Sequence, residues 1–397
     1  MGALEGSAET HHRLGATRRE GERVTPLELF FDLVFVLALT QCTALMSHNQ
    51  SWEGLAQGLL ILGVLWWAWV GYAWLTSVID PEAGVVRLVI FAAMAAMLIV
   101  SLCVQEAFGN LALTFALAIG FYRTAHIALF WLAGADDTDL RRSVLGLAVS
   151  TAVAVGLLVV ASSFDGFAQG ALWALAIFLD MAGPYFFGSD GWKIVPGHFA
   201  ERHGLIIIIA LGESIVAIGV GASGALDLGI GTAAVLGIFL TAALWWTYFD
   251  VVALISARRL GEAEVGRVQN ELARDSYSYI HLLMGAGIVL VAFGLKVTIA
   301  HHDEHLHDVP AFALLGGLAL YLLGLVAFRY RHVQTLNRKR LGLAIVLLFL
   351  VPVATAMPAL VTLAVAVVLI WLLIGYEHRG YGPDREQFRR EASAAHT

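Results

Sequence analysis

Basic residues occupy only every second connection between the apolar stretches of this chain, and this alternation limits what the chain can fold into. Of its 24 Lys and Arg residues, all except Lys296 can be placed on one side of a membrane. The tail before Thr25 is basic, and the later basic connections contain Arg87, Arg141, Arg142, Lys193, Arg202, Arg258 to Arg274, Arg329 to Arg340, and Arg379 to Arg390. The turns between them carry no Lys or Arg. Because loops rich in these residues stay in the cytoplasm, we expect both termini to be cytoplasmic.

Twelve apolar stretches account for this alternation, and each is near the ~20 residues that an α-helix needs to cross ~30 Å of hydrocarbon. They lie at residues 27–46, 55–79, 86–104, 111–133, 144–162, 169–187, 203–221, 230–250, 278–299, 310–328, 341–356 and 358–375. A hydrophobic fraction of 59% and a mean hydropathy of +0.77 are outside the range of soluble domains. The sequence therefore predicts an all-α polytopic membrane protein in a lipid bilayer. It has no basic surface typical of nucleic-acid binding.

Short matches between the two halves of the chain indicate an internal repeat. The matched pairs are Ala38 to Gln41 with Ala210 to Glu213, Trp66-Trp67 with Trp245-Trp246, and Ala107 to Gly109 with Ala292 to Gly294. Because six spans is an even number, both copies would enter the membrane in the same sense, as a parallel repeat. We therefore expect a polar tail at 1–24, six-helix repeats at 25–190 and 191–376, and a charged tail at 377–397.

Ionisable residues inside a span indicate where function lies, since a charge near the span centre costs ~2.5–3.5 kcal/mol on insertion scales. Glu28 has a structural alternative, because Thr25, Pro26 and Glu28 form the pattern of a helix capping box. Asp32 lies one turn deeper on the same face, where no cap can use it. Gln41 continues the polar residues toward the outer leaflet, although it lies on the other side of the helix.

The seventh stretch has a similar layout, with Glu201, Arg202 and His203 at its cytoplasmic mouth and Glu213 near its centre. Arg123, with His126 three residues later on the same face of the fourth stretch, is a candidate partner for Glu213. Arg202 could equally pair with Asp32, and a purely structural ion pair between helices is the alternative to a functional one.

The remaining polar clusters favour ordinary structural roles. Asp180, Asp250 and His281 lie nearer the cytoplasmic face and are expected to reach interfacial water. The turn from His301 to Asp308 is rich in His, Asp and Glu but has no fixed ligand spacing, so a solvated turn is favoured over a Zn²⁺ or Cu²⁺ site. The paired tryptophans favour helix packing and lipid contact over a ligand site. No enzyme signature is recognisable, and neither a metal nor a cofactor is expected.

The runs from Thr25 to Val36 and from Phe199 to Ser214 together resemble the bacterial low-temperature-requirement A (LtrA) family, over about Val24 to Tyr376. The resemblance implies a multi-pass protein of the bacterial cytoplasmic (inner) membrane. That family is named for a growth phenotype in the cold, so the resemblance implies no substrate.

The first stretch is also remotely similar to the first helix of the lysosomal and bacterial potassium/proton channel family, whose motif reads Phe-Ser-Asp. Phe31 replaces the serine, and Gly204 stands where a second aspartate is wanted, so an identical ion path is not implied.

Three classes of function fit these residues. The first is a transporter or channel for a small solute, cation or proton, in which Asp32 and Glu213 are the protonatable or ion-attracting groups. Glu28 and Glu201 would then shape the cytoplasmic entrance, and Arg202 and His203 would set the pKa values of the acids. The second is an intramembrane enzyme acting on a lipid-linked substrate through Glu28, Asp32, His203 and Asp250. The third is a scaffold or sensor in cold or stress adaptation, and a homo-oligomer is compatible with each.

Overall fold

The protein is described by a computed structural model covering residues 23–187, 191–223 and 226–394, with side chains described as far as Arg379. All the regular elements of these residues are helices. The first six long helices are α1 (Pro26–His48), α2 (Trp52–Val78), α3 (Gly84–Cys103), α4 (Ala112–Ala133), α5 (Thr138–Ala161) and α6 (Gly166–Phe186). The second part contains α7 (Pro196–Gly221), α8 (Leu228–Phe249), α9 (Val252–Glu262), α10 (Arg267–Leu272), α11 (His281–Ala300), α12 (Asp308–Ala311), α13 (Gly317–Val333), α14 (Arg338–Ala354) and α15 (Ala359–Ala394).

Eleven helical segments of the described chain are long and apolar enough to cross a membrane, which confirms the all-α polytopic prediction. The stretch expected at 341–356 is α14, a helix of 17 residues that spans only about 25 Å at 1.5 Å per residue. It is the one expected span that is not among the eleven, and its 17 residues are at the lower limit of the about 17–25 that transmembrane helices use. The seventh span also differs from expectation, because α7 begins at Pro196, about two turns before residue 203.

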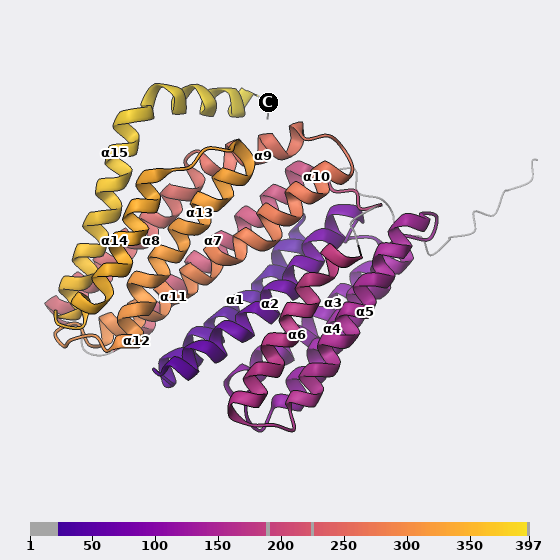
Figure 1. Cartoon of the computed structure of the whole chain (residues 1–397), viewed down its shortest axis with the longest axis horizontal. Helices are drawn as coiled ribbons and strands as arrows, with labels where there is room; N and C mark the ends of the chain where they lie inside the picture. The colour runs from indigo at the N-terminus through magenta and orange to yellow at the C-terminus, as the bar shows by residue number, and fades with distance from the viewer. Residues whose placement is uncertain (1–22, 188–190, 224–225, 395–397) are drawn as a thin grey trace, which may run out of the picture.

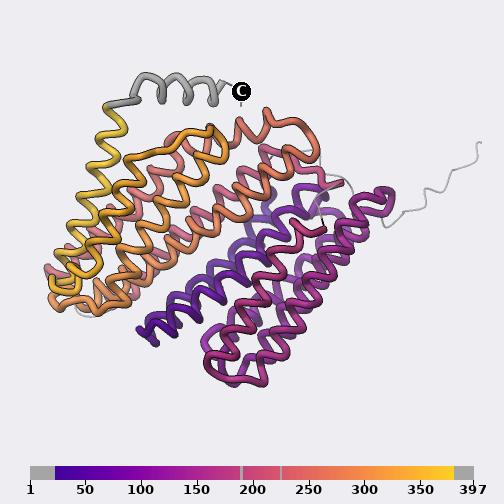
Figure 2. Tube along the Cα trace, viewed as in Figure 1, coloured from indigo at the N-terminus to yellow at the C-terminus, as the bar shows by residue number. Residues whose placement is uncertain are grey.

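The two halves of the chain lie side by side, with α1 to α6 on one side of the molecule and α7 to α15 on the other (Figures 1 and 2). At the centre, α1 packs against α7 and α11 as well as against its neighbours α2 and α3. The most apolar window of α2 is 78% buried and that of the segment containing α11 is 83% buried, against 22% for α6. The central helices therefore contact protein on most sides, whereas α6 faces the lipid.

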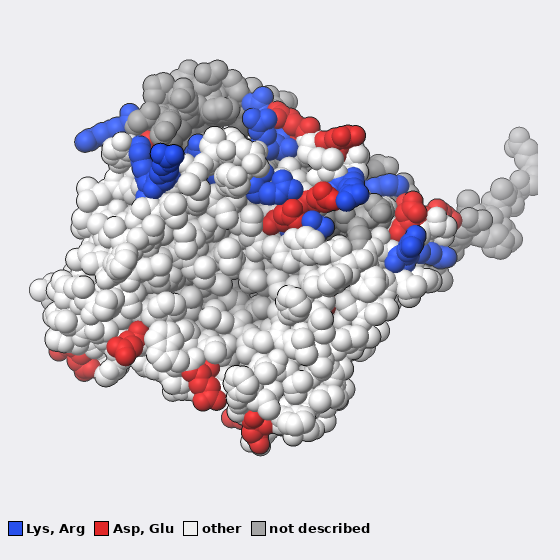
Figure 3. Space-filling model, in the orientation of Figure 1, with Lys and Arg blue, Asp and Glu red and all other residues white. Residues whose placement is uncertain are grey.

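Charged side chains are separated along the helix axes. Figure 3 shows Lys and Arg gathered together with Asp and Glu at one end of the bundle, Asp and Glu without Lys or Arg at the other end of this face, and a wide uncharged belt between them. We call the end that holds Arg87, Arg258 and Arg338 the basic end. Lys296 lies toward the opposite end, where its Nζ donates to Ser47 Oγ at 2.7 Å. The segregation expected from the sequence is therefore present in three dimensions.

A π-helical segment, Ala273–Ile280, joins α10 to α11 at the centre of the bundle. Such wide turns are rare and occur often at functional sites. The segment is anchored to α2, because Trp66 Nε1 donates to the carbonyl of Ser278 at 2.7 Å and Trp74 Nε1 donates to its Oγ at 2.9 Å. It also directs Tyr277 and His281 toward α7, where both rings contact His203.

Candidate functional site

Two acids of α1 and two bases of α7 meet in the interior at the basic end. Arg202 Nη2 lies 2.8 Å from Asp32 Oδ1, and Arg202 Nη1 lies 3.3 Å from Glu28 Oε1. His198 Nε2 lies 2.8 Å from the same oxygen of Glu28. None of these four side chains is more than 1% exposed. We call Glu28, Asp32, His198 and Arg202 the inner charge cluster.

The spacing of these residues explains why they meet. Glu28 and Asp32 are four residues apart on α1, and His198 and Arg202 are four apart on α7, so each pair lies on one face of its helix. The N-terminus of α1 is fixed by Thr25, which accepts a hydrogen bond from Glu28 N at 3.3 Å and donates its own N–H to Glu28 Oε2 at 2.8 Å. The capping box is therefore confirmed. Glu28 nevertheless also belongs to the inner charge cluster.

Counting charges shows what the inner charge cluster can do. Arg202 keeps its proton in any protein environment, so two ionised acids and a neutral His198 give the cluster a net charge of −1. An unbalanced charge is costly at this degree of burial. The cluster becomes neutral when it holds one further proton, either on a carboxylate or on His198.

One acceptor of the cluster remains available for such a proton or a cation. Asp32 Oδ1 is occupied, since it accepts from Trp69 Nε1 at 2.9 Å as well as from Arg202. Asp32 Oδ2 is buried and has no hydrogen-bond partner among the described residues. A buried carboxylate oxygen without a donor is costly and is commonly satisfied by a proton, water or ion.

A second polar group lies further along the same helices. Glu213 of α7 is 1% exposed and accepts hydrogen bonds from the hydroxyls of Thr40 and Thr43 on α1. One turn beyond Thr43, Ser47 accepts from Lys296 of α11. From Glu28 to Ser47, polar groups on α1 therefore span about 28 Å at 1.5 Å per residue, close to the thickness of the hydrocarbon core.

An apolar section separates the two polar groups. Between Asp32 and Thr40, α1 advances about 12 Å, and here it packs against apolar residues of α2, α7 and α11. A small cavity of about 20 Å³ lies in this section, lined among others by Phe35, Leu39, Trp66, Ile206, Ala210 and Val289. Such a volume holds about one water molecule. We call this section the apolar constriction.

Comparison with known proteins places this architecture in a family. A family model described as bacterial low temperature requirement A protein (LtrA) matches residues 23–374, which include every residue of the two polar groups. The chain belongs to the LtrA family.

A relative of this LtrA protein is the uncharacterized protein RA0937 of Rhizobium meliloti (strain 1021). The two are 29% identical, and the similarity covers 94% of this chain and 95% of the relative. No solved structure gives a significant match to the chain. The protein is thus a multi-pass membrane protein of a bacterial family.

The fourth helix of the LtrA protein does not supply a partner for Glu213, contrary to one expectation. Arg123 Nη2 instead lies 3.0 Å from Asp180 of α6 and donates to Thr151 of α5 at 2.7 Å. The expectation that Asp180 reaches interfacial water is therefore wrong as well, since its side chain is only 13% exposed. This pair joins helices within the first six and lies apart from the inner charge cluster.

Two other residues expected at interfacial water are also buried. His281 is fully buried, with Nε2 2.9 Å from the hydroxyl of Tyr248 and Nδ1 3.0 Å from the carbonyl of Ser276. Asp250 is 7% exposed and lines a cavity beside Arg340, away from Glu28 and Asp32. The four residues of the enzyme hypothesis therefore do not form one cluster.

The remaining predicted site residues have separate surroundings. His203 bonds through Nδ1 to the carbonyl of Phe199 at 2.8 Å and contacts the ring of Trp69, so it adjoins Asp32 only through that indole. Gln41 lies toward the end of the bundle opposite the basic end, where its Oε1 accepts from Gln105 Nε2 at 3.1 Å. It therefore belongs to neither of the two polar groups. Glu201 is exposed and lines a wide groove of about 1410 Å³ at the basic end.

Two members of this site were not predicted, and both had a detectable signal. His198 lies four residues before Arg202, but the seventh span was expected to begin only at residue 203. Pro196, which occupies the first helical position of α7, is the residue that marks the earlier start. Trp69 was not among the predicted site residues, although a buried indole N–H usually has an acceptor.

The tryptophan pairs and the histidine-rich turn are not part of the inner charge cluster. Trp66 and Trp67 are 5% and 6% exposed and pack between helices, whereas Trp245 is 45% exposed and faces outward. In the turn from His301 to Asp308, most side chains are exposed and Leu306 is buried against the bundle.

Proposed function

We propose that this LtrA protein is a transporter or channel that moves a proton or small cation along the interface of α1 with α7. The observation that carries the proposal is the placement of the inner charge cluster and Glu213 at two depths of the buried interface between α1 and α7. Ionisable groups kept inside a membrane at a cost usually mark ion or proton pathways. The apolar constriction between them corresponds to a closed pathway, because it excludes the hydrated ion.

The inner charge cluster supplies the chemistry of the proposed cycle. Proton binding at Asp32 Oδ2 leaves Arg202 paired with Glu28 alone, and proton release restores both pairs. Each step changes the cluster by a single charge. Glu213, bonded to two hydroxyls of α1, is the second acceptor on the far side of the constriction. Transfer between the two acids requires water to enter the constriction as α1 and α7 separate.

Flux through purified protein tests the proposal. Liposomes containing the wild type and an imposed proton or potassium gradient are expected to dissipate it faster than empty liposomes of the same lipid, with a rate that depends on pH. Stopped-flow fluorescence of an entrapped pH or potassium dye measures the rate. Wild-type liposomes that are no leakier than empty ones, with every monovalent cation tried, would reject transport and assign the acids a structural role.

Widening the apolar constriction is expected to increase flux. Replacing Leu39 with Ala removes a side chain from its wall and leaves room for more water, so the passive proton leak is expected to rise by about tenfold, as when a dewetted gate becomes hydrated. The matched control is Leu347→Ala, which creates a similar cavity in α14. Both variants lose stability, by about 2–5 kcal/mol on general experience with Leu→Ala changes. An equal leak in both variants would exclude a specific gate at the constriction.

We further propose that the basic end faces the cytoplasm of the bacterial inner membrane and that both termini lie there. A reporter fused after Arg259 or after Gln387 is then expected to be active only as a cytoplasmic reporter. A reporter inserted in the turn at 222–229 should be active only outside. Phosphatase activity after Arg259 would show that the orientation is reversed or that a span has been miscounted.

A further inference from the structure

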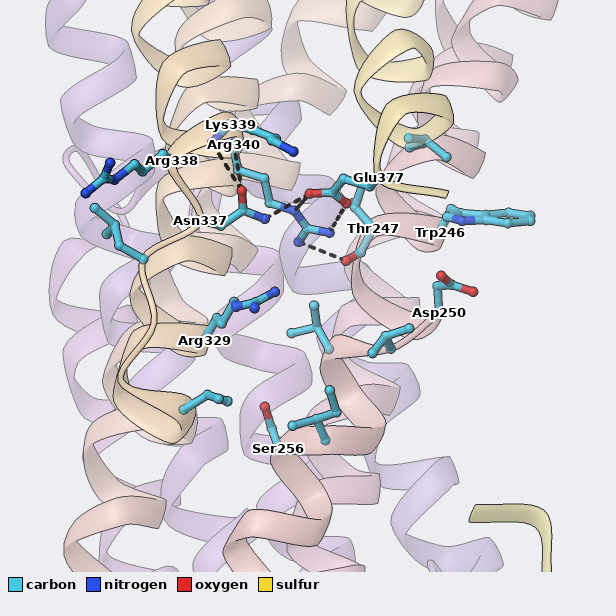
Figure 4. A pocket seen from close by; sticks show the side chains of 16 residues that line it. Trp246, Thr247, Asp250, Ser256, Arg329, Asn337, Arg338, Lys339, Arg340 and Glu377 are labelled. Atoms are coloured by element: carbon cyan, nitrogen blue, oxygen red, sulfur yellow. Dashed lines mark hydrogen bonds and ion pairs between the residues drawn. The ribbon is translucent and has the colours of Figure 1, made fainter. Parts of the chain in front are cut away.

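A second cavity, of about 350 Å³, lies at the basic end among α8, α9, α15 and the connection from α13 to α14 (Figure 4). Its wall contains Arg329, Arg338, Lys339 and Arg340, with Asp250 and Glu377 as the acids among the described side chains. The wall thus carries four cations against two acids. We call this space the basic cavity, and none of its residues belongs to the proposed transport path.

The acids do not neutralise all of these cations. Glu377 is taken up by Arg340, whose Nε and Nη2 lie 3.0 and 2.9 Å from its two oxygens. Figure 4 shows the guanidinium of Arg329 directed into the cavity below this pair. Its Nε donates to the hydroxyl of Thr335 at 3.1 Å, and no carboxylate of the described residues lies within 4.0 Å. Arg329 therefore presents donors and a positive charge to the cavity.

The start of α14 adds to the positive potential. Arg338, Lys339 and Arg340 are its first three residues, after the N-cap Asn337. A helix N-terminus carries a partial positive charge, so cations there are unfavourable and an anion is favourable. Arg340 is balanced by Glu377, so the N-terminus of α14 adds its partial positive charge to the charge of Arg329.

A further donor in the wall has no acceptor. The Nε1 of Trp246 is buried and has no hydrogen-bond partner among the described residues. The remainder of the wall is apolar and includes Val252, Ile255, Val333 and Ile374. Donors and positive charge therefore meet beside an apolar surface, at the end of the membrane spans.

We propose that the basic cavity binds the phosphate group of an anionic phospholipid. Phosphate oxygens match the guanidinium of Arg329 as acceptors. A free phosphate would satisfy the same donors, but the apolar wall and the position at the ends of the spans favour a lipid, whose acyl chains remain in the bilayer. The cavity volume is within the usual range for sites that hold a small molecule.

Lipid selectivity of the full-length protein tests this inference. The protein is placed in nanodiscs of phosphatidylcholine that contain a minority of phosphatidylglycerol. Native mass spectrometry releases it from the nanodiscs and counts the lipids that stay bound to it. The wild type is expected to retain phosphatidylglycerol preferentially. Arg329→Gln should reduce that preference by about tenfold, the effect of losing one hydrogen bond to a charged group. Arg329→Lys should retain most of it, and Arg87→Gln, an exposed cation at the same end, should leave it unchanged.

The alternatives give distinct results. Equal retention of both lipids by the wild type would overturn the inference, as would an equal loss in Arg329→Gln and Arg87→Gln. If millimolar inorganic phosphate displaces all of the bound lipid from the wild type, and phosphate binding also depends on Arg329, the cavity is a site for free phosphate instead. If Arg329→Gln is poorly folded, Lys339→Gln replaces it in the comparison, because it removes another cation from the cavity wall and should lower the preference in the same direction.

Discussion

Replacing Asp32 with Asn is expected to abolish proton or cation flux while leaving the protein folded. Asn has nearly the shape of Asp and can still accept from Trp69. Without the Asp32 charge, Arg202 and Glu28 balance each other, so the inner charge cluster is neutral with no exchangeable proton. We expect flux to fall by about 100-fold or more, the range over which a positioned proton-transfer group contributes. The measurement is dye-monitored flux in liposomes, with folded yield from size-exclusion chromatography.

The matched control is Glu82→Gln, which neutralises an exposed acid at the basic end and should leave flux unchanged. Glu213→Gln is expected to behave like Asp32→Asn if both acids serve one path. Flux that survives in Asp32→Asn at the level of the control would remove Asp32 from the path. A loss in Asp32→Asn with full flux in Glu213→Gln would restrict the path to the basic end.

Removing Arg202 is expected to have the largest effect on stability. Arg202→Met leaves Glu28 and Asp32 buried without their shared cation, and breaking a buried pair in this way typically costs about 3–5 kcal/mol. Arg258→Met is the control, because Arg258 lies 2.7 Å from Glu262 in an exposed pair. Exposed pairs at this spacing contribute only about 0.3–0.5 kcal/mol. Unfolding by sodium dodecyl sulfate in mixed micelles, followed by tryptophan fluorescence, measures the difference.

A double variant separates charge balance from packing. If Arg202→Met destabilises because charge is left unbalanced, adding Asp32→Asn should restore part of the loss. The two changes would then be strongly non-additive, as expected for groups in direct contact. Simple additivity would mean that Arg202 stabilises the bundle mainly through packing against Phe31 and Trp69, whose rings lie 6.0 and 5.6 Å from its guanidinium carbon.

Hydropathy and charge alternation were sufficient to predict the helices, because the bilayer requires each span to be long, apolar and internally hydrogen-bonded. The limits of α4 at Ala112 and Ala133 differ by at most one residue from those expected. Polar residues at a helix start were harder to assign, so the first two turns of α7 were missed. The π-helical turn at Ala273–Ile280 has no hydropathy signal, since widening a turn leaves composition unchanged.

The pairing of side chains on different helices was predicted less well than the depth of each residue along its own helix. The pairing of Arg202 with Asp32 was one of the alternatives that the sequence left open. The pairing of Arg123 with Asp180 was missed, because hydropathy gives the depth of a residue but not which helices are neighbours. Glu213 was correctly placed in the interior, but its partners are the hydroxyls of Thr40 and Thr43, which are common in spans and drew no attention.

The inner charge cluster also imposes an order on biosynthesis. Its two shortest contacts, Glu28 with His198 and Asp32 with Arg202, each join residues 170 positions apart. At about 5–20 residues per second, roughly 10–30 s pass between the synthesis of the two acids of α1 and that of their partners on α7. Throughout that interval, Glu28 and Asp32 lack His198 and Arg202. A chain interrupted after Phe186 lacks His198 and Arg202, so the two acids of its first helix have no ion-pair partners even though the helix is complete.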